Sequence, residues 1–293
     1  MKKVAKAAAL MLATVMMTAS LTACGSKPDT TQANDAAVSG QPQKTEESTV
    51  VEKQNETDTQ KATPEAETTL TFGTNAEFPP FEYVASSGVI DQYDGIDMAI
   101  AKNIAEANGM TAVVENMEFD SLLVALQNGQ IDAAIAGMTV TEDRKEEADF
   151  STPYYTATQV MIVKEDSDIT SAADMADKKI CVIQGYTGEI CVKDLGYPYE
   201  AFKKGTDAIM ELVNGKCDVV VIDSATAEKY VFDNQGLKIV EDASAFESEE
   251  YAIAVKKGNT ELLDKINKAI ETMLADGTVA ELGAQYIEAI SAE

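Results

Sequence analysis

A planar guanidinium occurs at a single position in this chain, because Arg144 is the only arginine among its 23 basic residues. It follows Thr141 by three residues, in the first turn of an expected helix, where backbone N–H groups also favour an anion. A guanidinium binds a carboxylate through two parallel hydrogen bonds, which an ammonium does not do. Arg144 therefore predicts a carboxylate site, and the alternative is a structural ion pair with Glu142 or Glu146.

A carboxylate follows the apolar run 217–222, which is typical of a buried strand. At the end of such a strand, Asp223 would point into the mouth of a cleft and pair with an ammonium group. An aspartate here also suits the N-cap of a helix beginning at Ser224, and both roles can hold together. With Arg144, Asp223 predicts a site for a carboxylate and an ammonium about one carbon apart, as in an α-amino acid.

Two glycine-bearing turns are candidates for the rest of such a site. In the turn 136–139, Gly137 permits close backbone approach and Thr139 offers a hydroxyl. The turn 184–188 follows an expected strand at 179–183, and its backbone amides are a candidate nest for an anion.

Two aromatic rings stand on either side of a stiff proline pair. Phe78 and Phe81 follow the first expected strand, which begins at Leu70. We expect Phe81 to pack in the core, whereas Phe78 is either a core residue or a lid over the ligand side chain.

The elements that must hold these residues alternate between helix and strand. Apolar spacing predicts a helix over 97–108, a second helix from an Asp120 cap to Gly129, and a buried strand over 131–136. Residues 126–135 and 212–221 share one pattern of helix, Asn-Gly stop and Asp-led strand, either as a repeat or by chance. Two α/β lobes fit this pattern, and facing lobes place a ligand in the cleft between them.

Composition excludes several other classes of function. The chain has 293 residues and no histidine, so neither a Ser-His-Asp nor a Cys-His nucleophile can be built, and no imidazole can bind zinc. We expect no catalytic group, metal or cofactor. The formal charge of −27 argues against nucleic acid and against electrostatic docking on anionic lipid.

The first 67 residues carry targeting signals rather than a fold. Lysines at 2, 3 and 6 precede an apolar run over 7–20, which is too short to span a membrane comfortably. Residues 21–24, Leu-Thr-Ala-Cys, resemble the lipobox of bacterial lipoproteins, which makes 1–23 a signal peptide and Cys24 the lipidated first residue of the mature chain. Residues 25–67 are polar and are expected to form a disordered tether.

Three cysteines follow Cys24, so at most one disulfide can form among them. Cys181 and Cys217 stand in strand-like runs and are expected to be buried apolar residues, whereas the thiol state of Cys191 stays open.

Three stretches of the chain, over 73–83, 95–100 and 132–155, resemble the family-3 extracellular solute-binding proteins, the polar amino acid receptors of ABC importers. The resemblance covers about residues 68–290. It implies a two-lobed periplasmic-binding-protein-like fold of type II. Lobe 1 would comprise 68–153 and 253–293, lobe 2 would comprise 159–247, and the hinge crossings would be 154–158 and 248–252.

The same resemblance implies a role for each site residue. Arg144 and Thr139 would bind the ligand carboxylate, and Asp223 its ammonium. Phe78 and Phe119 would sandwich the side chain, and Asn75 would read its polarity. Backbone amides in two further stretches would also bind the ligand carboxylate, at Ala136, Gly137 and Thr187. Ile183 and Ile222 stand where some relatives place polar side-chain readers, so the amino acid is not specified, and Glu77 either favours a basic side chain or faces solvent.

The expected function is therefore capture of a free L-amino acid by hinge closure and its delivery to an ABC transporter permease. The protein would be a monomer, held on the outer face of the cell membrane by its lipid alone, in an organism of the Gram-positive type. The alternatives are a cyclohexadienyl-dehydratase-like enzyme on the same scaffold, with Glu77 or Asp223 as acid–base, and a sensor or adhesin lipoprotein.

Overall fold

The computed structural model describes residues 68–292. The predicted signal peptide, Cys24 and the tether lie outside these residues. Within the described part of the chain, no helix is both long and apolar enough to span a bilayer.

A five-stranded sheet in the order β5-β1-β6-β14-β7 is the centre of the first lobe. β1 is parallel to β5 and β6, and the late strand β14 joins antiparallel to β6 and β7. The strands are β1 (Thr69–Thr74), β5 (Thr111–Asn116), β6 (Ala133–Ala134), β7 (Ala148–Phe150) and β14 (Ala254–Lys256).

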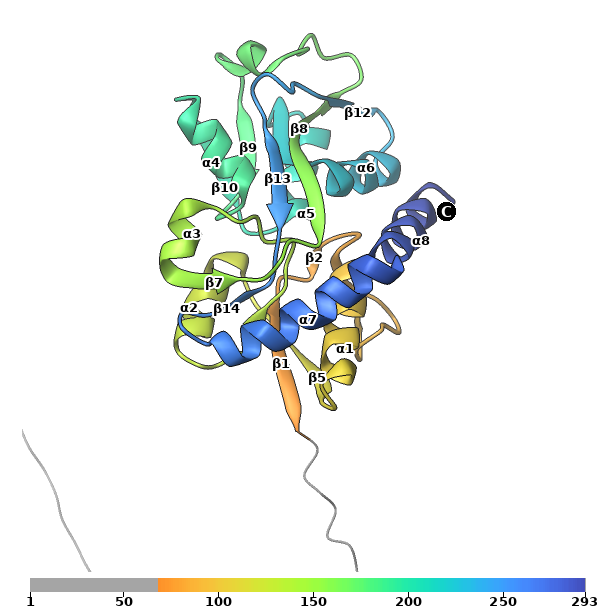
Figure 1. Ribbon diagram of the computed structural model, residues 1–293. Helices are drawn as coiled ribbons and strands as arrows, with labels where there is room; N and C mark the ends of the chain where they lie inside the picture. The colour runs from red at the N-terminus through yellow and green to blue at the C-terminus, as the bar shows by residue number, and fades with distance from the viewer. Residues whose placement is uncertain (1–67, 293) are drawn as a thin grey trace, which may run out of the picture. The chain divides into compact units, whose positions relative to one another are not determined.

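The helices of this lobe are α1 (Ile96–Ala107), the 3-10 turn η1 (Phe119–Ser121), α2 (Leu122–Gln127), α3 (Glu142–Glu147), α7 (Thr260–Asp276) and α8 (Thr278–Ala292). A small sheet carries the aromatic turn and consists of β2 (Glu77–Phe78), β3 (Glu82–Val84) and β4 (Tyr93–Asp94). The helix α8 packs against α1 and α7 and reaches α6 of the second lobe (Figure 1).

The second lobe is built on a six-stranded sheet with the path β10-β9-β11-β8-β12, and β13 also pairs with β8. Its strands are β8 (Tyr155–Lys164), β9 (Ile180–Ile183), β10 (Tyr199–Phe202), β11 (Val219–Asp223), β12 (Leu237–Val240) and β13 (Ser248–Tyr251). Its helical elements are η2 (Ala172–Met175), α4 (Thr187–Asp194), α5 (Gly205–Val213) and α6 (Ser224–Asp233). Every residue of β11 is buried, as expected of a Val-Ile strand covered on both faces.

The chain passes between the lobes on two strands that lie side by side (Figure 1). β8 and β13 pair antiparallel from Thr158 with Ser248 to Tyr155 with Tyr251. The two predicted crossings at 154–158 and 248–252 fall on these strands. The prediction of a two-lobed α/β fold of type II is confirmed, whereas the role of the crossings as hinges stays a prediction.

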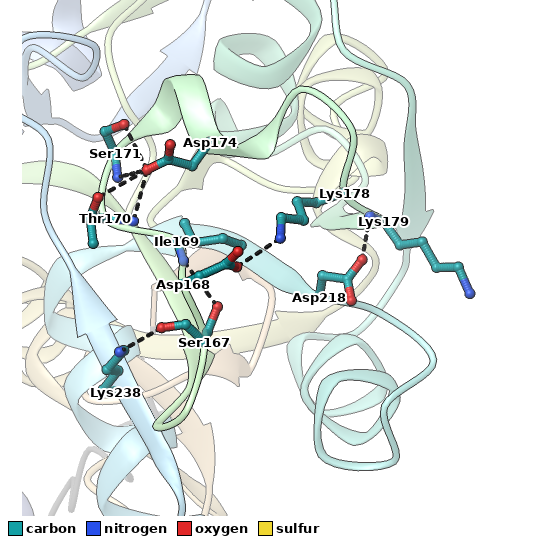
Figure 2. A network of polar contacts seen from close by, with 10 residues as sticks. All are labelled: Ser167, Asp168, Ile169, Thr170, Ser171, Asp174, Lys178, Lys179, Asp218 and Lys238. Carbon is teal, nitrogen blue, oxygen red and sulfur yellow. Dashed lines mark hydrogen bonds and ion pairs between the residues drawn. The ribbon is translucent and has the colours of Figure 1, made fainter.

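The two predicted helix-turn-strand copies have the same geometry in the structure. In each copy the glycine of the Asn-Gly stop adopts a positive φ, 70° in the first and 71° in the second. The aspartate that follows accepts a hydrogen bond of 2.8 Å from a backbone amide at the start of a neighbouring strand, Asp132 from Thr71 and Asp218 from Lys179. Figure 2 shows the second of these contacts. The shared sequence pattern therefore produces one local structure twice.

Two predicted elements were wrong in detail. The strand expected over 131–136 is a ladder of only two residues, Ala133–Ala134, because the chain then turns towards the cleft. Asp120 does not cap the second helix: it lies inside η1, and its carboxylate accepts a hydrogen bond of 2.8 Å from Gln184 in the other lobe.

A polar network stabilises the loop that leads from β8 to β9 (Figure 2). One carboxylate oxygen of Asp174 accepts from the backbone amides and the hydroxyls of Thr170 and Ser171, at 3.0 Å in each case. Lys178 forms an ion pair of 2.7 Å with Asp168. The loop is therefore ordered by side chains rather than by a sheet.

The three cysteines of the described residues are free thiols. Cys181 and Cys217 are buried, as predicted, and Cys217 donates to the carbonyl of Val219 at 3.1 Å. Cys191 is half-buried, and burial raises the pKa of its thiol to about 12, which makes it a weak nucleophile at neutral pH.

Candidate functional site

A small cavity lies where the two lobes meet. Its volume is about 10 Å³. Its walls come from both lobes and are formed by Phe78, Phe119, Ala136, Gly137, Tyr186, Thr187 and Asp223. All of these except Tyr186 were predicted site residues, so the structure brings six of the predicted residues together from distant parts of the chain.

Arg144 is 8% exposed and lies in α3, whose N-cap Thr141 accepts from the backbone amide of Arg144. Its guanidinium donates to the carbonyl of Thr139 at 2.7 Å and, across to the second lobe, to the carbonyl of Gly185 at 2.9 Å. The group also lies 5.1 Å above the ring of Phe119. The ion pairs of the described residues include none between Arg144 and either Glu142 or Glu146, and Glu142 pairs instead with Lys145 at 2.9 Å.

Asp223 ends β11 at the N-cap position of α6, but its side chain makes no capping hydrogen bond. Its carboxylate is 3% exposed and accepts from the hydroxyl of Tyr251 at 2.5 Å. Burial, together with the nearby carboxylate of Glu249, raises the pKa of Asp223 to about 7. A cation beside Asp223 would offset the free-energy cost of burying its negative charge, so the position suits an ammonium group.

A second carboxylate, Glu249 on β13, belongs to the site and was missed by the sequence analysis. It accepts from the hydroxyl of Thr139 at 2.7 Å and from the amide of Gln159 at 3.4 Å. It also favours the charged form of Arg144, whose pKa is lowered by burial. Glu249 lies in the predicted return crossing. Its charge at that position was the one feature of the sequence that could have identified it as a site residue.

Thr139 joins the lobes through its hydroxyl. The oxygen donates to Glu249 and accepts from the hydroxyl of Thr187 at 3.0 Å. Its backbone forms an isolated bridge with Tyr251. The two predicted threonines therefore lie on opposite sides of the cleft, in contact with each other.

Gly137 has a φ of 53°, and a Cβ there would lie 2.5 Å from the ring of Phe78, so only glycine fits. Its backbone amide donates to the carboxylate of Asp97 at 2.8 Å and is therefore engaged within the protein. Asp97 also accepts from the hydroxyl of Tyr154 at 2.8 Å. This carboxylate thus connects α1, the cleft turn and the crossing at 154–158.

Asp97 shares its buried environment with Glu82. Burial raises the pKa of Glu82 well above its usual value, and the carboxylate of Asp97 raises it further. Burial also raises the pKa of Asp97 to about 6. The raised pKa favours the protonated form of Glu82, which reduces the repulsion between the two neighbouring carboxyl groups.

The aromatic part of the site differs from a simple pair of rings. The ring of Tyr186 lies edge-on to Phe78, with centroids 5.3 Å apart, and edge-on to Phe119, with centroids 4.7 Å apart. Its hydroxyl donates to Asn75 Oδ1 at 2.8 Å, and Asn75 Nδ2 donates to the carbonyl of Met117 at 2.9 Å. Phe81 packs in the core as predicted, stacked on Phe78.

Further contacts between the lobes show that the cleft is closed. Glu77 forms an ion pair of 2.8 Å with Lys204, and its carbonyl accepts from the hydroxyl of Tyr230 at 3.2 Å. Glu77 therefore binds the opposite lobe. Ile183 and Ile222 are each 1% exposed and belong to the apolar core of the structure.

The chain matches the sequence pattern of the bacterial extracellular solute-binding proteins, family 3, over residues 70–289. It is 34% identical to the arginine-binding extracellular protein ArtP of Bacillus subtilis (strain 168) over 223 residues, which cover 74% of this chain and 85% of the relative.

Two solved structures have the same fold. The arginine-, lysine-, histidine-binding protein ArtJ of Geobacillus stearothermophilus superposes with a TM-score of 0.70 at 34% identity, over 74% of this chain and 94% of that one. An ancestral arginine-binding protein bound to glutamine gives a TM-score of 0.70 at 42% identity, over 76% of this chain and 99% of that one. The family match covers more than half of the chain and includes every described residue of the cavity, so this protein belongs to the bacterial extracellular solute-binding proteins of family 3.

Proposed function

We propose that this protein captures a free L-amino acid outside the cytoplasm and delivers it to the permease of an ABC importer. The observation that carries the proposal is a buried guanidinium, Arg144, that lies over Phe119 and interacts electrostatically with Asp223, where Phe119 and Asp223 line one small cavity between two lobes. A guanidinium and a carboxylate in one buried site match the two charged groups of an amino acid zwitterion. Relatives named for arginine, histidine and glutamine binding support the same ligand class.

In this proposal the site residues other than Gly137 keep their predicted roles. Arg144 and Thr139 bind the ligand carboxylate, with backbone amides near Ala136 and Thr187, and Asp223 binds the ammonium. Because Gly137 donates its amide to Asp97, its part is to allow close approach of the backbone rather than to bind the anion. Ligand binding would replace the guanidinium contacts to Thr139 and Gly185 with two hydrogen bonds to a carboxylate.

Closure would occur about the paired strands at 154–158 and 248–252. Two strands side by side can absorb a change of backbone angle without a break in either lobe. The interlobe contacts of Glu77 with Lys204 and of Asp120 with Gln184 form only when the lobes meet, so they favour the closed form. The closed form is the one that the permease would recognise.

The proposal includes anchoring to the outer face of the membrane. Residues 1–23 would be removed as a signal peptide, Cys24 would carry the lipid, and residues 25–67 would be a tether. The protein would act as a monomer and without catalysis, since Glu77 is in an ion pair with Lys204 and Asp223 is the ammonium partner.

Thermal unfolding of the secreted chain, residues 25–293, against the twenty amino acids and common carboxylic acids tests the proposal. A ligand at one hundred times its dissociation constant stabilises the folded protein by about 2.7 kcal/mol, which raises the melting temperature measurably. We expect a shift from one or a few L-amino acids, lost in Arg144→Lys and Asp223→Asn. A shift only from acids that lack an α-amino group would overturn the role of Asp223.

A further inference from the structure

We infer that Tyr186 is a specificity-determining residue: its ring fills the side-chain part of the site and limits the ligand to amino acids with short side chains. The inference rests on the proposed function. It starts from the one residue of the cavity wall that was not predicted from the sequence.

The ring of Tyr186 contacts both of the rings that would otherwise hold a ligand side chain. Its centroid is 5.3 Å from that of Phe78 and 4.7 Å from that of Phe119, with interplanar angles of 88° and 63°. Edge-to-face contacts at these distances are favourable for both pairs. The slot between Phe78 and Phe119 is therefore filled by a residue of the protein itself.

The polar end of the slot is also occupied. The hydroxyl of Tyr186 donates to Asn75 Oδ1, while Asn75 Nδ2 donates to the carbonyl of Met117. Both ends of the Asn75 amide are thus in use. A ligand with a polar group at the end of a long side chain would have to displace the hydroxyl of Tyr186 to reach Asn75.

The backbone fixes Tyr186 in this place. It is the N-cap residue of α4, its amide donates to the carbonyl of Ile183, and its carbonyl accepts from Glu189 and Ile190. The preceding amide, of Gly185, donates to the carboxylate of Glu189 at 2.6 Å. The side chain is 6% exposed, so swinging the ring out would expose apolar surface.

Little space remains in the closed site with the ring in place. The cavity volume is about 10 Å³, whereas pockets for small molecules usually measure about 300–1,000 Å³. Its walls near Gly137, Thr187 and Asp223 are those assigned to the carboxylate and ammonium. Any amino acid must therefore part the lobes to enter. Glycine, alanine, serine or cysteine could then bind with the ring of Tyr186 in place, whereas the side chain of arginine or glutamine would have to displace the ring. This separates the chain from relatives named for arginine binding.

The test is calorimetric titration of the secreted chain and two variants with glycine, alanine, serine, cysteine, glutamine, lysine and arginine. Tyr186→Thr removes the ring and keeps a small hydroxyl, whereas Tyr186→Phe keeps the ring and removes only the bond to Asn75. We expect the wild-type protein to bind at least one short amino acid at least tenfold more tightly than arginine and glutamine. Tyr186→Thr should improve the affinity ratio of long to short ligands at least tenfold, and Tyr186→Phe should leave the size limit in place.

The wild-type preference decides the inference even if Tyr186→Thr does not fold. Tighter binding of arginine, lysine or glutamine than of every short amino acid would overturn it and leave the proposed function intact. A short-ligand preference that persists unchanged in a folded Tyr186→Thr variant would also overturn it, because the limit would then arise elsewhere. No binding of any amino acid by a folded wild-type chain would instead contradict the proposed function.

Discussion

Tyr251 on the crossing strand β13 donates its hydroxyl hydrogen to Asp223 at the end of β11, with 2.5 Å between the oxygens. Tyr251 is fully buried and also stacks on Tyr155, its partner in the crossing. The carboxylate assigned to the ligand ammonium is therefore held by the strand about which the lobes would close. The hydroxyl of Tyr251 only partly offsets the free-energy cost of burying the charge of Asp223. The protonation state of Asp223 should therefore change when a ligand binds beside it.

The affinity for an amino acid should weaken below pH 7. Burial raises the pKa of Asp223 to about 7, whereas a bound ammonium favours the charged carboxylate and lowers that pKa. Binding below pH 7 therefore releases a proton, and the affinity should fall by about tenfold for each pH unit below the pKa of the free protein. Calorimetry at pH 6 in buffers of different ionisation enthalpy measures this proton. Absence of proton release at pH 6 would contradict the assignment.

Glu249 should set the pH at which this change occurs. Its carboxylate raises the pKa of Asp223, so Glu249→Gln should lower that pKa and keep tight binding to a more acidic pH. The amide oxygen of the variant can still accept from Thr139, so the interlobe geometry is retained. Glu250→Gln is the control, because Glu250 is exposed on the same strand. Equal pH profiles for the two variants would show that Glu249 does not act on Asp223.

Replacing the single arginine should separate its planar shape from its charge. Arg144→Lys keeps the positive charge but loses the two parallel donors, so we expect affinity for the amino acid to fall by about 2–4 kcal/mol. Lys145→Met is the control, because Lys145 is half-exposed and pairs only with Glu142 among the ion pairs of the described residues. Isothermal titration of both variants gives the affinities. An affinity unchanged in Arg144→Lys would favour a structural role for the guanidinium.

The buried Glu82 should make the protein less stable as pH rises. Its pKa in the folded state lies well above the usual 4.5, so its contribution is present below pH 4.5 and is lost as pH rises towards the folded-state pKa. Glu82→Gln stays neutral at every pH. We therefore expect this variant to have a higher free energy of unfolding than the wild-type chain at pH 8–9, and little difference at pH 4.

Urea denaturation at pH 4, 7 and 9 checks this expectation. Glu115→Gln is the control, because Glu115 is exposed on β5. Parallel pH profiles for wild-type protein and Glu82→Gln would mean that Glu82 is not protonated in the folded state.

The positions of several site residues within helices and strands were predictable from the sequence, because these positions depend on residues close by in the chain. Thr141 caps α3 and puts Arg144 in its first turn, and an apolar run puts Asp223 at the end of a buried strand. The repeat of Asn-Gly and aspartate predicted the same turn twice. Alternation of helix and strand gave the two-lobed fold.

The contacts that define the cavity were decided by the tertiary structure. Tyr186 meets Asn75 across 111 positions of the chain, and Glu249 meets Thr139 across 110. The amide of Gly137 is taken by Asp97, 40 positions away. Periodicity and caps describe residues within a few turns of one another, so they cannot say which side chain from the other lobe fills a space. The sequence thus determined which groups lie at the cleft. The packing of the lobes determined which of these groups remain available to a ligand, because a ring from one lobe fills space in the other, and a carboxylate from one lobe accepts the hydrogen bonds that the other offers.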